Sequence, residues 1–448
     1  MKTVNTALTI AGSDPSGGAG IQADLKTFSA LKIFAQSVIT SVTTQSTLGV
    51  KGAFHLPFET VEQQLSALLN DKKPSAVKTG MLANEAIVDC VARILKRGKI
   101  KKLVVDPVIR SSNGKTLLSA KGVQALKENL LPLALVVTPN IKEAEILSGI
   151  KITRPGDRLK AARAILKTGA KSVLITGGHL KGKPEDFFYD GGRPLLLESE
   201  RLGDGDLHGT GCVFSSAIAG GLARGETLAS AIAGAKEFME QAILGGAISG
   251  QGKGNVEPLS SLYQNAERWD LYQRVSAAVD VLKDAKIGCL IPEVQSNLGV
   301  GLEGARTHQD VIGFPGRIVK YGENIVTLSP PQYGGSKHVA NIVLTAMRYN
   351  PDKRAVMNIK YTPELLKICQ RLKFKIATFN REDEPKNVRR KEGSSLEWGT
   401  DTAIQGCGYV PDIIYDIGGF GKEEMIRVLA DDIESLVDMI LKIHRLSQ

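Results

Sequence analysis

The sequence predicts an α/β protein, in which a three-layer α/β/α domain is followed by a second, smaller α/β domain. In the first part of the chain, short apolar segments typical of buried strands alternate with amphipathic helical segments, as in a parallel sheet covered on both faces. A stretch rich in Gly and Ser ends this alternation, and the 448 residues are ample for two domains. We therefore expect domains at residues 1–247 and 262–448, joined by a linker at 248–261.

Strands and helices are expected to alternate through the first domain. The first strand is expected at residues 4–11, and a Gly-rich loop at 12–20 leads from it into a helix with one apolar face. Further strands are expected at residues 37–44, 76–78, 102–106, 134–138 and 172–176. Further helices are expected at residues 60–69, 85–97, 121–130, 157–168, 212–223 and 228–244. Ligands of such sheets bind at the carboxyl ends of the strands, where most of the loops described below begin.

The second domain is expected to contain both strands and helices. A long polar helix at residues 262–284 comes first. Strands are then expected at residues 287–291, 310–314, 325–328, 355–359, 376–379 and 412–417, and helices at 337–348, 363–372 and 422–445. Residues 381–400 are highly charged without periodicity, which predicts a surface loop.

Composition excludes several classes of protein. Apolar residues make up 42% of the chain and charged residues 23%, which is ordinary for a globular protein and excludes wholesale disorder. No apolar run approaches the roughly 18 residues of a membrane span, and the N-terminus lacks the apolar core of a signal peptide. The five Cys residues are an odd number without a C-x-x-C pair. We therefore expect a cytoplasmic protein with no disulfide framework and no membrane contact.

The net charge of +10 is concentrated in the first part of the chain. Residues 1–260 carry 32 Lys and Arg against 23 Asp and Glu, whereas residues 261–448 carry 25 against 24. A basic half suits ligands that carry phosphate as well as nucleic acid. Because the basic residues are scattered rather than clustered, we expect small phosphate-bearing substrates and no nucleic-acid partner.

Two glycine-rich segments of the first domain indicate phosphate binding. The segment GSDPSGGAG, Gly12 to Gly20, joins a strand to a helix, where glycines let the backbone approach a ligand; a tight turn explains it about as well. The segment HGTGC, His208 to Cys212, opens a helix of small residues, and the amides of such a helix start form an anion site. Close helix packing is the alternative explanation for its glycines.

Side chains that bear oxygen follow further strands. Asp106 ends one expected strand, and Asn140 and Glu143 stand three residues apart at a helix start, so both can face one site. An amide oxygen together with carboxylates suits Mg²⁺. The alternative for the pair is an Asn cap with an acidic first turn. Thr176 and Gly178 lie in the segment TGGH after another strand, which offers its backbone to a nucleotide.

The order of these segments is more specific than any one of them. The segments GSDPSGGAGIQADLKTF, SVTTQSTLGV, VKTGML, VDPV, TPNIKEAE, TGGH and HGTGC follow one another over residues 12–212. This order resembles the hydroxymethylpyrimidine/phosphomethylpyrimidine kinases of thiamine biosynthesis, which are ribokinase-like proteins. The resemblance covers about residues 1–258. It implies phosphorylation of 4-amino-5-hydroxymethyl-2-methylpyrimidine to its phosphate and then its diphosphate, with ATP and Mg²⁺.

The resemblance also implies roles for individual residues. Gln45 would hydrogen-bond the aminopyrimidine, and Asp24 would assist it. The residues implied in lining the pyrimidine pocket are Gly12, Met81 and Val108. Those implied in binding phosphates, ATP or Mg²⁺ are Gly209, Gly211, Thr176, Gly178, Asp106, Asn140 and Glu143.

Two positions depart from related kinases. Cys212 stands where many ribokinase-like sugar kinases carry an Asp that acts as the base. A thiol at a helix start can have a lowered pKa, which makes Cys212 the candidate base. The alternative is that Cys212 is only a small residue, and that Mg²⁺ and positioning suffice for phosphoryl transfer. Thr176 stands where some pyrimidine kinases carry a Lys, so a contact between that Lys and the ATP phosphates is not expected in this chain.

Most of the chemical signal of the second domain lies in residues 313–347. Two glycines, Ser336 and Lys337 precede an apolar helix face, which makes a second helix-start anion site with a hydroxyl and an amine. His338 lies in the first helical turn, and Arg317 follows a glycine in a turn. From composition alone, a helix-end residue and a surface cation are the simpler interpretations of these two.

Residues from about 262 to 446 resemble the thiamine-phosphate synthase domain that is fused behind pyrimidine kinases, mainly in archaea. The match includes QSNLGVG, GARTHQDV, FNRE, EWGTDTAI and PDIIYDIGGFGKE. The resemblance implies condensation of the pyrimidine diphosphate with thiazole phosphate to thiamine phosphate, with release of pyrophosphate. Arg317 and His338 stand at the places of an Arg and a His that are important for catalysis in that family. Arg317 would hold the leaving diphosphate, and His338 would protonate it.

The alternative is a pyridoxal-type kinase with a C-terminal regulatory domain that binds a thiamine-related ligand. Pyridoxal kinases share the fold and the GTGC segment, and related second domains follow DNA-binding segments in repressors. No helix-turn-helix is evident ahead of residue 262, and the second domain is nearly neutral, so the enzyme is favoured. We also expect the chain to assemble as a homo-oligomer, a dimer.

Overall fold

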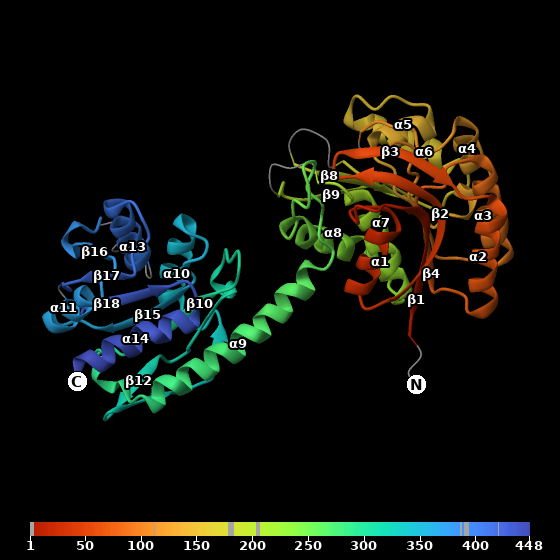
Figure 1. Cartoon of the computed structure of the whole chain (residues 1–448). Helices are drawn as coiled ribbons and strands as arrows, with labels where there is room; N and C mark the ends of the chain where they lie inside the picture. The colour runs from red at the N-terminus through yellow and green to blue at the C-terminus, as the bar shows by residue number, and fades with distance from the viewer. Residues whose placement is uncertain are drawn as a thin grey trace. The chain divides into compact units, whose positions relative to one another are not determined.

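The chain folds into two compact units, Met1–Tyr263 and Gln264–Gln448 (Figure 1). The computed structural model describes residues 4–111, 113–177, 183–202, 207–385, 388, 394–419 and 421–448. Within these residues, no helix is long and apolar enough to cross a membrane.

A nine-stranded sheet forms the centre of the first unit, in the order β3-β2-β1-β4-β5-β6-β7-β8-β9. The strands are β1 (Thr6–Ser13), β2 (Phe34–Ser46), β3 (Gly49–His55), β4 (Ala76–Thr79), β5 (Leu103–Val105), β6 (Val136–Val137), β7 (Val173–Ile175), β8 (Glu185–Tyr189) and β9 (Leu195–Glu198). The six strands from β2 to β7 pair in parallel, whereas β3 at one edge and β8 and β9 at the other are antiparallel. The parallel strands bring their carboxyl ends to one edge of the sheet, where the predicted site residues follow them.

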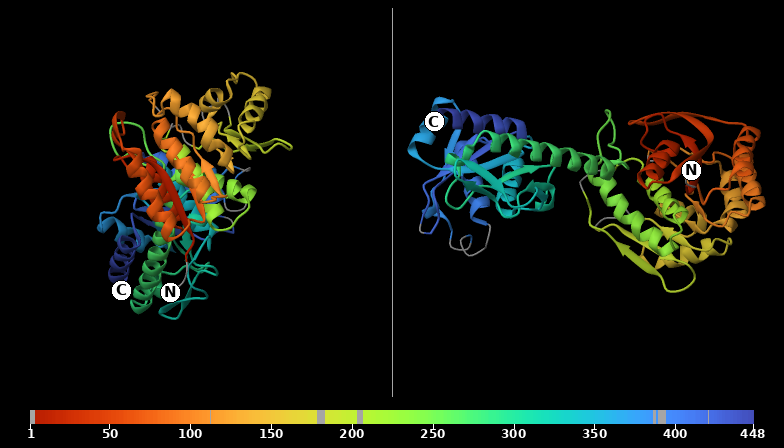
Figure 2. Two further views of the ribbon diagram at one scale, coloured as in Figure 1. Left: turned by 90° about the vertical axis from the view of Figure 1, so that its right-hand side faces the viewer. Right: turned by 90° about the horizontal axis from the view of Figure 1, so that it is seen from below.

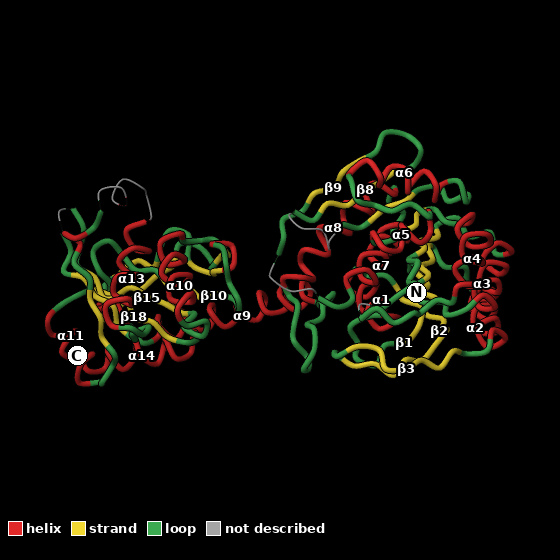
Figure 3. The backbone as a smooth tube through the Cα atoms, turned by 90° about the horizontal axis from the view of Figure 1, so that it is seen from above, coloured by secondary structure: helices red, strands yellow, loops and turns green. Residues whose placement is uncertain are grey.

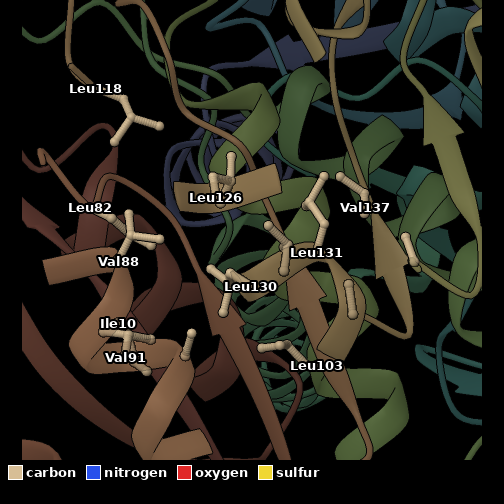
Figure 4. Close-up of a cluster of buried hydrophobic side chains, with 14 of the residues drawn as sticks. Ile10, Leu82, Val88, Val91, Leu103, Leu118, Leu126, Leu130, Leu131 and Val137 are labelled. Atoms are coloured by element: carbon tan, nitrogen blue, oxygen red, sulfur yellow. The ribbon is translucent and has the colours of Figure 1, made fainter. Parts of the chain in front are cut away.

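Helices cover both faces of this sheet, which gives the predicted three layers. Figure 3 shows α1 and α7 on one side of the strands and α2, α3 and α4 on the other. The helices are α1 (Gly20–Ala30), α2 (Phe58–Asp71), α3 (Glu85–Arg97), α4 (Ala120–Ala125), α5 (Ile141–Ser148), α6 (Pro155–Leu166), α7 (Thr210–Ala223) and α8 (Leu228–Leu244). Strand side chains alternate between the layers. Leu103 and Val105 share an apolar cluster with α3, and Figure 4 labels Leu103 of that cluster, whereas Val104 shares a cluster with α7.

The predicted linker packs against the first unit instead of joining two units. Ala247 and Asn255 exchange two backbone hydrogen bonds, of 3.0 and 2.9 Å, which close the segment into a loop. The Gly252 amide donates to Thr47 Oγ1 at 3.1 Å, and a Cβ on Gly252 would lie 2.0 Å from the Thr47 carbonyl oxygen. The glycines therefore serve close backbone contact rather than flexibility, and the boundary between the units falls inside α9 (Ser260–Asp284).

A seven-stranded sheet forms the centre of the second unit, in the order β14-β11-β10-β15-β18-β17-β16. Its strands are β10 (Leu298–Gly301), β11 (Val311–Gly313), β14 (Gln332–Tyr333), β15 (Ala355–Lys360), β16 (Ile376–Thr378), β17 (Ile413–Asp416) and β18 (Met425–Ala430), with a separate hairpin of β12 (Ile318–Tyr321) and β13 (Asn324–Thr327). Of the described strands in this sheet, β16 and β17 pair in parallel, and the other neighbours are antiparallel.

Among the described residues, two helices pack on one face of this sheet and three on the other. The helices α10 (Lys337–Tyr349) and α13 (Ser394–Cys407) share one apolar cluster. The helices α9, α11 (Pro363–Arg371) and α14 (Ile433–Ser447) share the other. Figure 2 shows α14, in dark blue, alongside α9, in green. The second unit is thus also layered, but mainly around an antiparallel sheet.

Several predicted elements of the second unit are wrong. Residues 287–291 form a 3₁₀ turn, η3 (Ile287–Leu290), rather than a strand, and α13 begins inside the predicted surface loop at 381–400. The helix predicted at 422–445 is divided into β18 and α14. A short apolar run that is buried on all sides cannot be assigned to strand or helix by periodicity, and Asp432, which caps α14, marks the true start of that helix.

We expect Gly221→Ala to destabilise the first unit. A Cβ there would lie 2.9 Å from Ala231 Cβ and 3.1 Å from its Cα, where α7 meets α8, so overpacking should cost about 1–3 kcal/mol. The matched control is Gly234→Ala in α8, where a Cβ meets nothing within 4 Å and Ala should gain up to about 1 kcal/mol. Urea unfolding of the full chain measures both; equal midpoints for the two variants would contradict the packing argument.

Candidate functional site

A cavity of about 620 Å³ lies at the carboxyl ends of the parallel strands in the first unit. It is lined by eleven of the residues predicted for the kinase site: Gly12, Gln45, Met81, Asp106, Val108, Asn140, Glu143, Thr176, Gly209, Gly211 and Cys212. Gly178 lies outside the described residues. The loops that follow β1, β4, β5, β6 and β7 therefore converge on one site.

The anion site predicted at the start of α7 has the required backbone. Gly209 precedes the helix with a φ of +91°, in the left-handed region, and no side chain caps the helix there. A Cβ on Gly209 would lie 1.9 Å from the carbonyl oxygen of Gly18, so only glycine allows the two glycine-rich loops to touch. The amides of Gly211 and its neighbours consequently open toward the cavity with the positive end of the helix dipole.

Asn140 and Glu143 form the helix cap that was the alternative interpretation of this pair. Asn140 Oδ1 accepts from the Glu143 amide at 3.0 Å, and Glu143 Oε2 accepts from the Asn140 amide at 3.0 Å. Glu143 Oε1 accepts from the Ile109 amide at 3.2 Å. Burial and then the charge of Asp106 raise the pKa of Glu143 to about 8. The cap thus holds the buried carboxyl group of Glu143 close to that of Asp106.

The oxygens of this edge fit a divalent cation such as Mg²⁺. Asp106 Oδ2 accepts from Ser215 Oγ at 2.9 Å, and the buried hydroxyl of Thr138, which also lines the cavity, has no hydrogen-bond partner. Two neighbouring carboxylates that repel one another gain from a shared cation. Among the described residues there is no cluster of three His, Cys, Asp or Glu placed to hold a metal, so phosphate and water would supply most of its ligands.

Asp24 lies beneath the cavity rather than in its wall, which corrects its predicted contact with the pyrimidine. Its carboxylate is completely buried and accepts from Lys78 Nζ at 2.9 and 2.8 Å, from Thr9 Oγ1 at 2.6 Å and from Ser216 Oγ at 2.7 Å. Burial alone would lower the pKa of Lys78, but Asp24 and the other acidic groups of the site raise it. Asp24 therefore fixes a cation under the site.

Cys212 does not have the lowered pKa expected for a base. Burial raises the pKa of its thiol to about 12; Lys78 opposes this effect, and the charges of Asp24 and Asp106 add to it. The helix start was expected to favour the thiolate, but two carboxylates close by disfavour a further negative charge. The thiol is accordingly protonated at neutral pH.

Two polar residues of the site, Asp14 and His208, were not predicted as site residues. Gln45 Nε2 lies 2.9 Å from His208 Nε2, and that nitrogen lies 3.5 Å from Asp14 Oδ2. Burial would raise the pKa of Asp14, but its contacts with His208 and Ser16 outweigh burial and lower it. Asp14 and His208 stand in the two glycine-rich segments, so the motifs contained the signal, but only the fold brings Gln45 into contact with His208.

A second cavity, of about 780 Å³, lies in the second unit. All four residues predicted for this domain line it: Arg317, Ser336, Lys337 and His338. Ser336 precedes α10 without capping it, so the first amides of a 13-residue helix are free of side-chain caps. Arg317 adopts a φ of +71°, unusual for a residue with a side chain, and its guanidinium donates to the Val294 carbonyl. The cavity therefore combines a helix start with basic side chains, as an anion site requires.

Each unit matches one family of known proteins. Residues 14–257 match the family described as phosphomethylpyrimidine kinase, and residues 274–442 match the one described as thiamine-phosphate synthase ThiN. The bifunctional thiamine biosynthesis protein ThiDN of Methanocaldococcus jannaschii is 35% identical over 442 residues, which is 98% of this chain and 98% of that protein. The chain belongs to this bifunctional family.

The bifunctional family's two activities account for the two units. The chain is an enzyme of thiamine biosynthesis, with a hydroxymethylpyrimidine/phosphomethylpyrimidine kinase domain and a thiamine-phosphate synthase domain. The corresponding kinase of Haemophilus influenzae is 46% identical over 259 residues, covering 57% of this chain and 96% of that protein. The structure of Bacillus subtilis pyridoxal kinase with ADP is similar at a TM-score of 0.54 and 37% identity, covering 58% of this chain and 100% of that one. The predicted family, fold class and bifunctional activity are confirmed.

We expect alkylation of Cys212 by iodoacetamide to keep accelerating well above pH 9. Only the thiolate reacts, and with a pKa of about 12 its fraction rises about tenfold per pH unit from pH 8 to pH 11. Peptide mapping by mass spectrometry measures the rate, and the exposed Cys289 in the same digest reports reagent activity. A rate for Cys212 that levels off below pH 9 would restore the acidic thiol first predicted.

Proposed function

We propose that the cavity of the first unit is the site at which ATP phosphorylates hydroxymethylpyrimidine and then its phosphate. One observation carries this proposal: the helix-start anion site and the carboxylates face one another in the same cavity, because a Cβ on Gly211 would lie 4.0 Å from Asp106 Oδ2. Phosphoryl transfer needs both, amides for the transferred group and acidic oxygens for the metal.

Asp106 and Glu143 would hold Mg²⁺, together with the Thr138 hydroxyl, water and phosphate oxygens. Mg²⁺ held by these residues would neutralise the negative charge that develops on the phosphate oxygens during transfer. Asn140 Oδ1 is already engaged by the Glu143 amide, so we assign Asn140 the positioning of Glu143 rather than direct contact with the metal. Thr176 would offer ATP its backbone at the end of β7.

Transfer in this cavity would depend on positioning rather than on a strong base. The thiol of Cys212 holds its proton at neutral pH, and the loose transition state of phosphoryl transfer places little demand on a base. Gly209 and Gly211 would hold the transferred group with backbone amides. Gln45, held by His208, would orient the pyrimidine against Gly12, Met81 and Val108.

We expect Gln45→Ala to weaken recognition of the pyrimidine and to spare ATP. A side-chain amide both donates and accepts, and its loss leaves buried ligand groups unpaired, at a cost of about 1–3 kcal/mol, or about 5- to 150-fold in kcat/KM. The matched control is Gln124→Ala, an exposed glutamine of α4. Kinase assays at varied pyrimidine and varied ATP measure the two effects; an unchanged kcat/KM for the pyrimidine would contradict the assignment.

The similarity to pyridoxal kinases gives the first unit a rival substrate. The Staphylococcus aureus pyridoxal kinase with ADP is similar at a TM-score of 0.55 and 36% identity, over 58% of this chain and 95% of that one. Both substrates are heteroaromatic alcohols, so the cavity shape alone does not separate them. The same assay with pyridoxal tests the choice, and we expect kcat/KM to favour hydroxymethylpyrimidine.

For the second unit, we propose that its cavity condenses the pyrimidine diphosphate with thiazole phosphate. Ionisation of the bond between the pyrimidinylmethyl carbon and oxygen leaves charge on the departing diphosphate. Arg317 would hold that charge with a guanidinium fork, and the amides at Ser336 and Lys337 would share it. His338, in the first turn of α10, would supply a proton to the leaving group.

We expect Arg317→Ala and His338→Ala to cripple formation of thiamine phosphate while pyrimidine diphosphate still accumulates. The kinase cavity belongs to the other unit and shares no residue with this one. Chromatography of the products from ATP, hydroxymethylpyrimidine and thiazole phosphate separates the two compounds. Arg306→Ala, at an exposed arginine of the same unit outside the cavity, is the control. Loss of the diphosphate as well would contradict two independent sites.

Two further expectations stay proposals, and the domain boundary is proposed anew. We propose a homodimer, a location in the cytoplasm, and a kinase domain that extends beyond the predicted residue 247 to include the predicted linker. The last of these follows from the backbone contacts of Gly252 with Thr47. The first two rest on the sequence resemblance and on composition.

A further inference from the structure

One carboxylate stands in the wall of the cavity in the second unit. Among the described residues that line this cavity, Glu423 is the acidic one. The basic residues that line it are Arg317, Lys337, Arg381, Lys422 and Arg427. A negative charge in the wall of a site for a diphosphate repels that substrate. The place of Glu423 therefore indicates a role other than binding the phosphates.

Both carboxylate oxygens of Glu423 are engaged by consecutive backbone amides. Oε1 accepts from the Glu293 amide at 2.9 Å, and Oε2 accepts from the Val294 amide at 2.8 Å. Hydrogen bonds to a charged acceptor are stronger than those between neutral groups, and two successive amides form a natural anion site. Glu423 consequently fixes the backbone at residues 293 and 294.

Val294 is also the backbone contact of Arg317. The Arg317 guanidinium donates from Nη1 to the Val294 carbonyl, and the amide of the same residue donates to Glu423. This contact uses one of the five N–H donors of a guanidinium. Val294 therefore links the carboxylate to the guanidinium, and a shift of Val294 would move the group to which Arg317 is anchored.

The backbone on both sides of this contact is strained. Gln295 has a φ of +68° and Arg317 a φ of +71°, in the left-handed region that residues with a side chain rarely adopt. The next residues, Ser296 and Ile318, exchange backbone hydrogen bonds of 3.0 and 2.8 Å. Strained conformations persist only where the surrounding contacts hold them, and Glu423 supplies two such contacts.

The loop that carries Glu423 has a fixed shape. Gly419 and Lys422 exchange two backbone hydrogen bonds, of 3.0 and 2.9 Å. Gly418 has a φ of +75°, and its amide donates to the buried Asp416 at 3.0 Å. A Cβ on Gly418 would lie 2.7 Å from the Lys422 carbonyl oxygen, so only glycine allows the loop to close. Glu423 follows directly and is thus presented from a rigid support.

We propose that Glu423 is a positioning residue of the condensation, which fixes Val294 and, through it, the guanidinium of Arg317. The inference rests on the condensation proposed above for this cavity, with the departing diphosphate held at Arg317. Donors that are already in place stabilise a developing charge without rearrangement during the reaction. This gain opposes the repulsion between Glu423 and the diphosphate, so the two effects have opposite signs.

The test uses this difference in sign. Full-length enzyme receives purified pyrimidine diphosphate and thiazole phosphate without ATP, so the kinase step is bypassed. We expect Glu423→Gln to lower kcat/KM for the pyrimidine diphosphate at least tenfold, because the new side-chain amino group would face a backbone N–H. KM for thiazole phosphate should stay within twofold. If Glu423 were only a negative charge in the wall, the same substitution would raise kcat/KM for the pyrimidine diphosphate.

Glu424→Gln is the matched control, because Glu424 is the next carboxylate in the chain, exposed and outside the cavity. It should leave both constants unchanged. Glu423→Gln is also made in an Arg317→Lys background, where the cation stays but its fork is lost. There we expect the loss caused by Glu423→Gln to shrink to within twofold, since the two residues act through one contact.

Thermal unfolding checks that each variant folds. If Glu423→Gln does not, Glu423→Asp, which keeps the charge and shortens the reach, decides by the same comparison, and kcat/KM should again fall. A raised or unchanged kcat/KM, or the full loss also in the Arg317→Lys background, would overturn the positioning role. Should Arg317→Ala leave condensation intact, the proposed location of the reaction fails instead.

Discussion

Each cavity lies over a completely buried carboxylate that holds basic side chains in place. In the first unit Asp24 pairs with one cation, Lys78, and accepts two hydroxyl groups as well, so the charges balance. In the second unit Asp416 accepts from two cations, Arg381 and Arg427. Each carboxylate is fully satisfied, and removing either one would leave buried cations unpaired. The electrostatic character of both sites depends on these two pairings.

The two units consequently bind phosphate by different means. The first presents the carboxylates of Asp106 and Glu143 to its cavity. It therefore binds phosphate through the amides at the start of α7 and through cations that these carboxylates hold. The second presents Arg317, Arg381 and Arg427 directly. A kinase must bind and release several phosphate species in turn, which suits labile metal and amide contacts. A condensing enzyme must hold two anionic substrates against their mutual repulsion, which suits fixed guanidinium groups.

Much of the fold could be predicted from sequence, because its strands and helices are separated by strong local signals. The bounds of α3 and α8 agree with the prediction, since apolar periodicity and helix caps point the same way there. The strands β8, β9 and β18 were missed, because pairing in the sheet rather than local preference decides them. A linker was predicted at residues 248–261 because a glycine needed for close contact looks the same in a sequence as one in a connection between domains.

The site residues differ in the same way in whether the sequence alone could predict them. Residues on loops after strands, such as Asp106 and Gly209, were predictable because the parallel sheet brings all such loops to one edge. Lys78 and Arg427 were not, because each lies within a strand among apolar neighbours, and its partner is chosen by the fold. Each phosphorylation adds about 1.5–2 negative charges to the pyrimidine. The basic side chains that line the cavity of the second unit, Arg317, Lys337 and Arg427 among them, therefore suit substrates that carry this added charge.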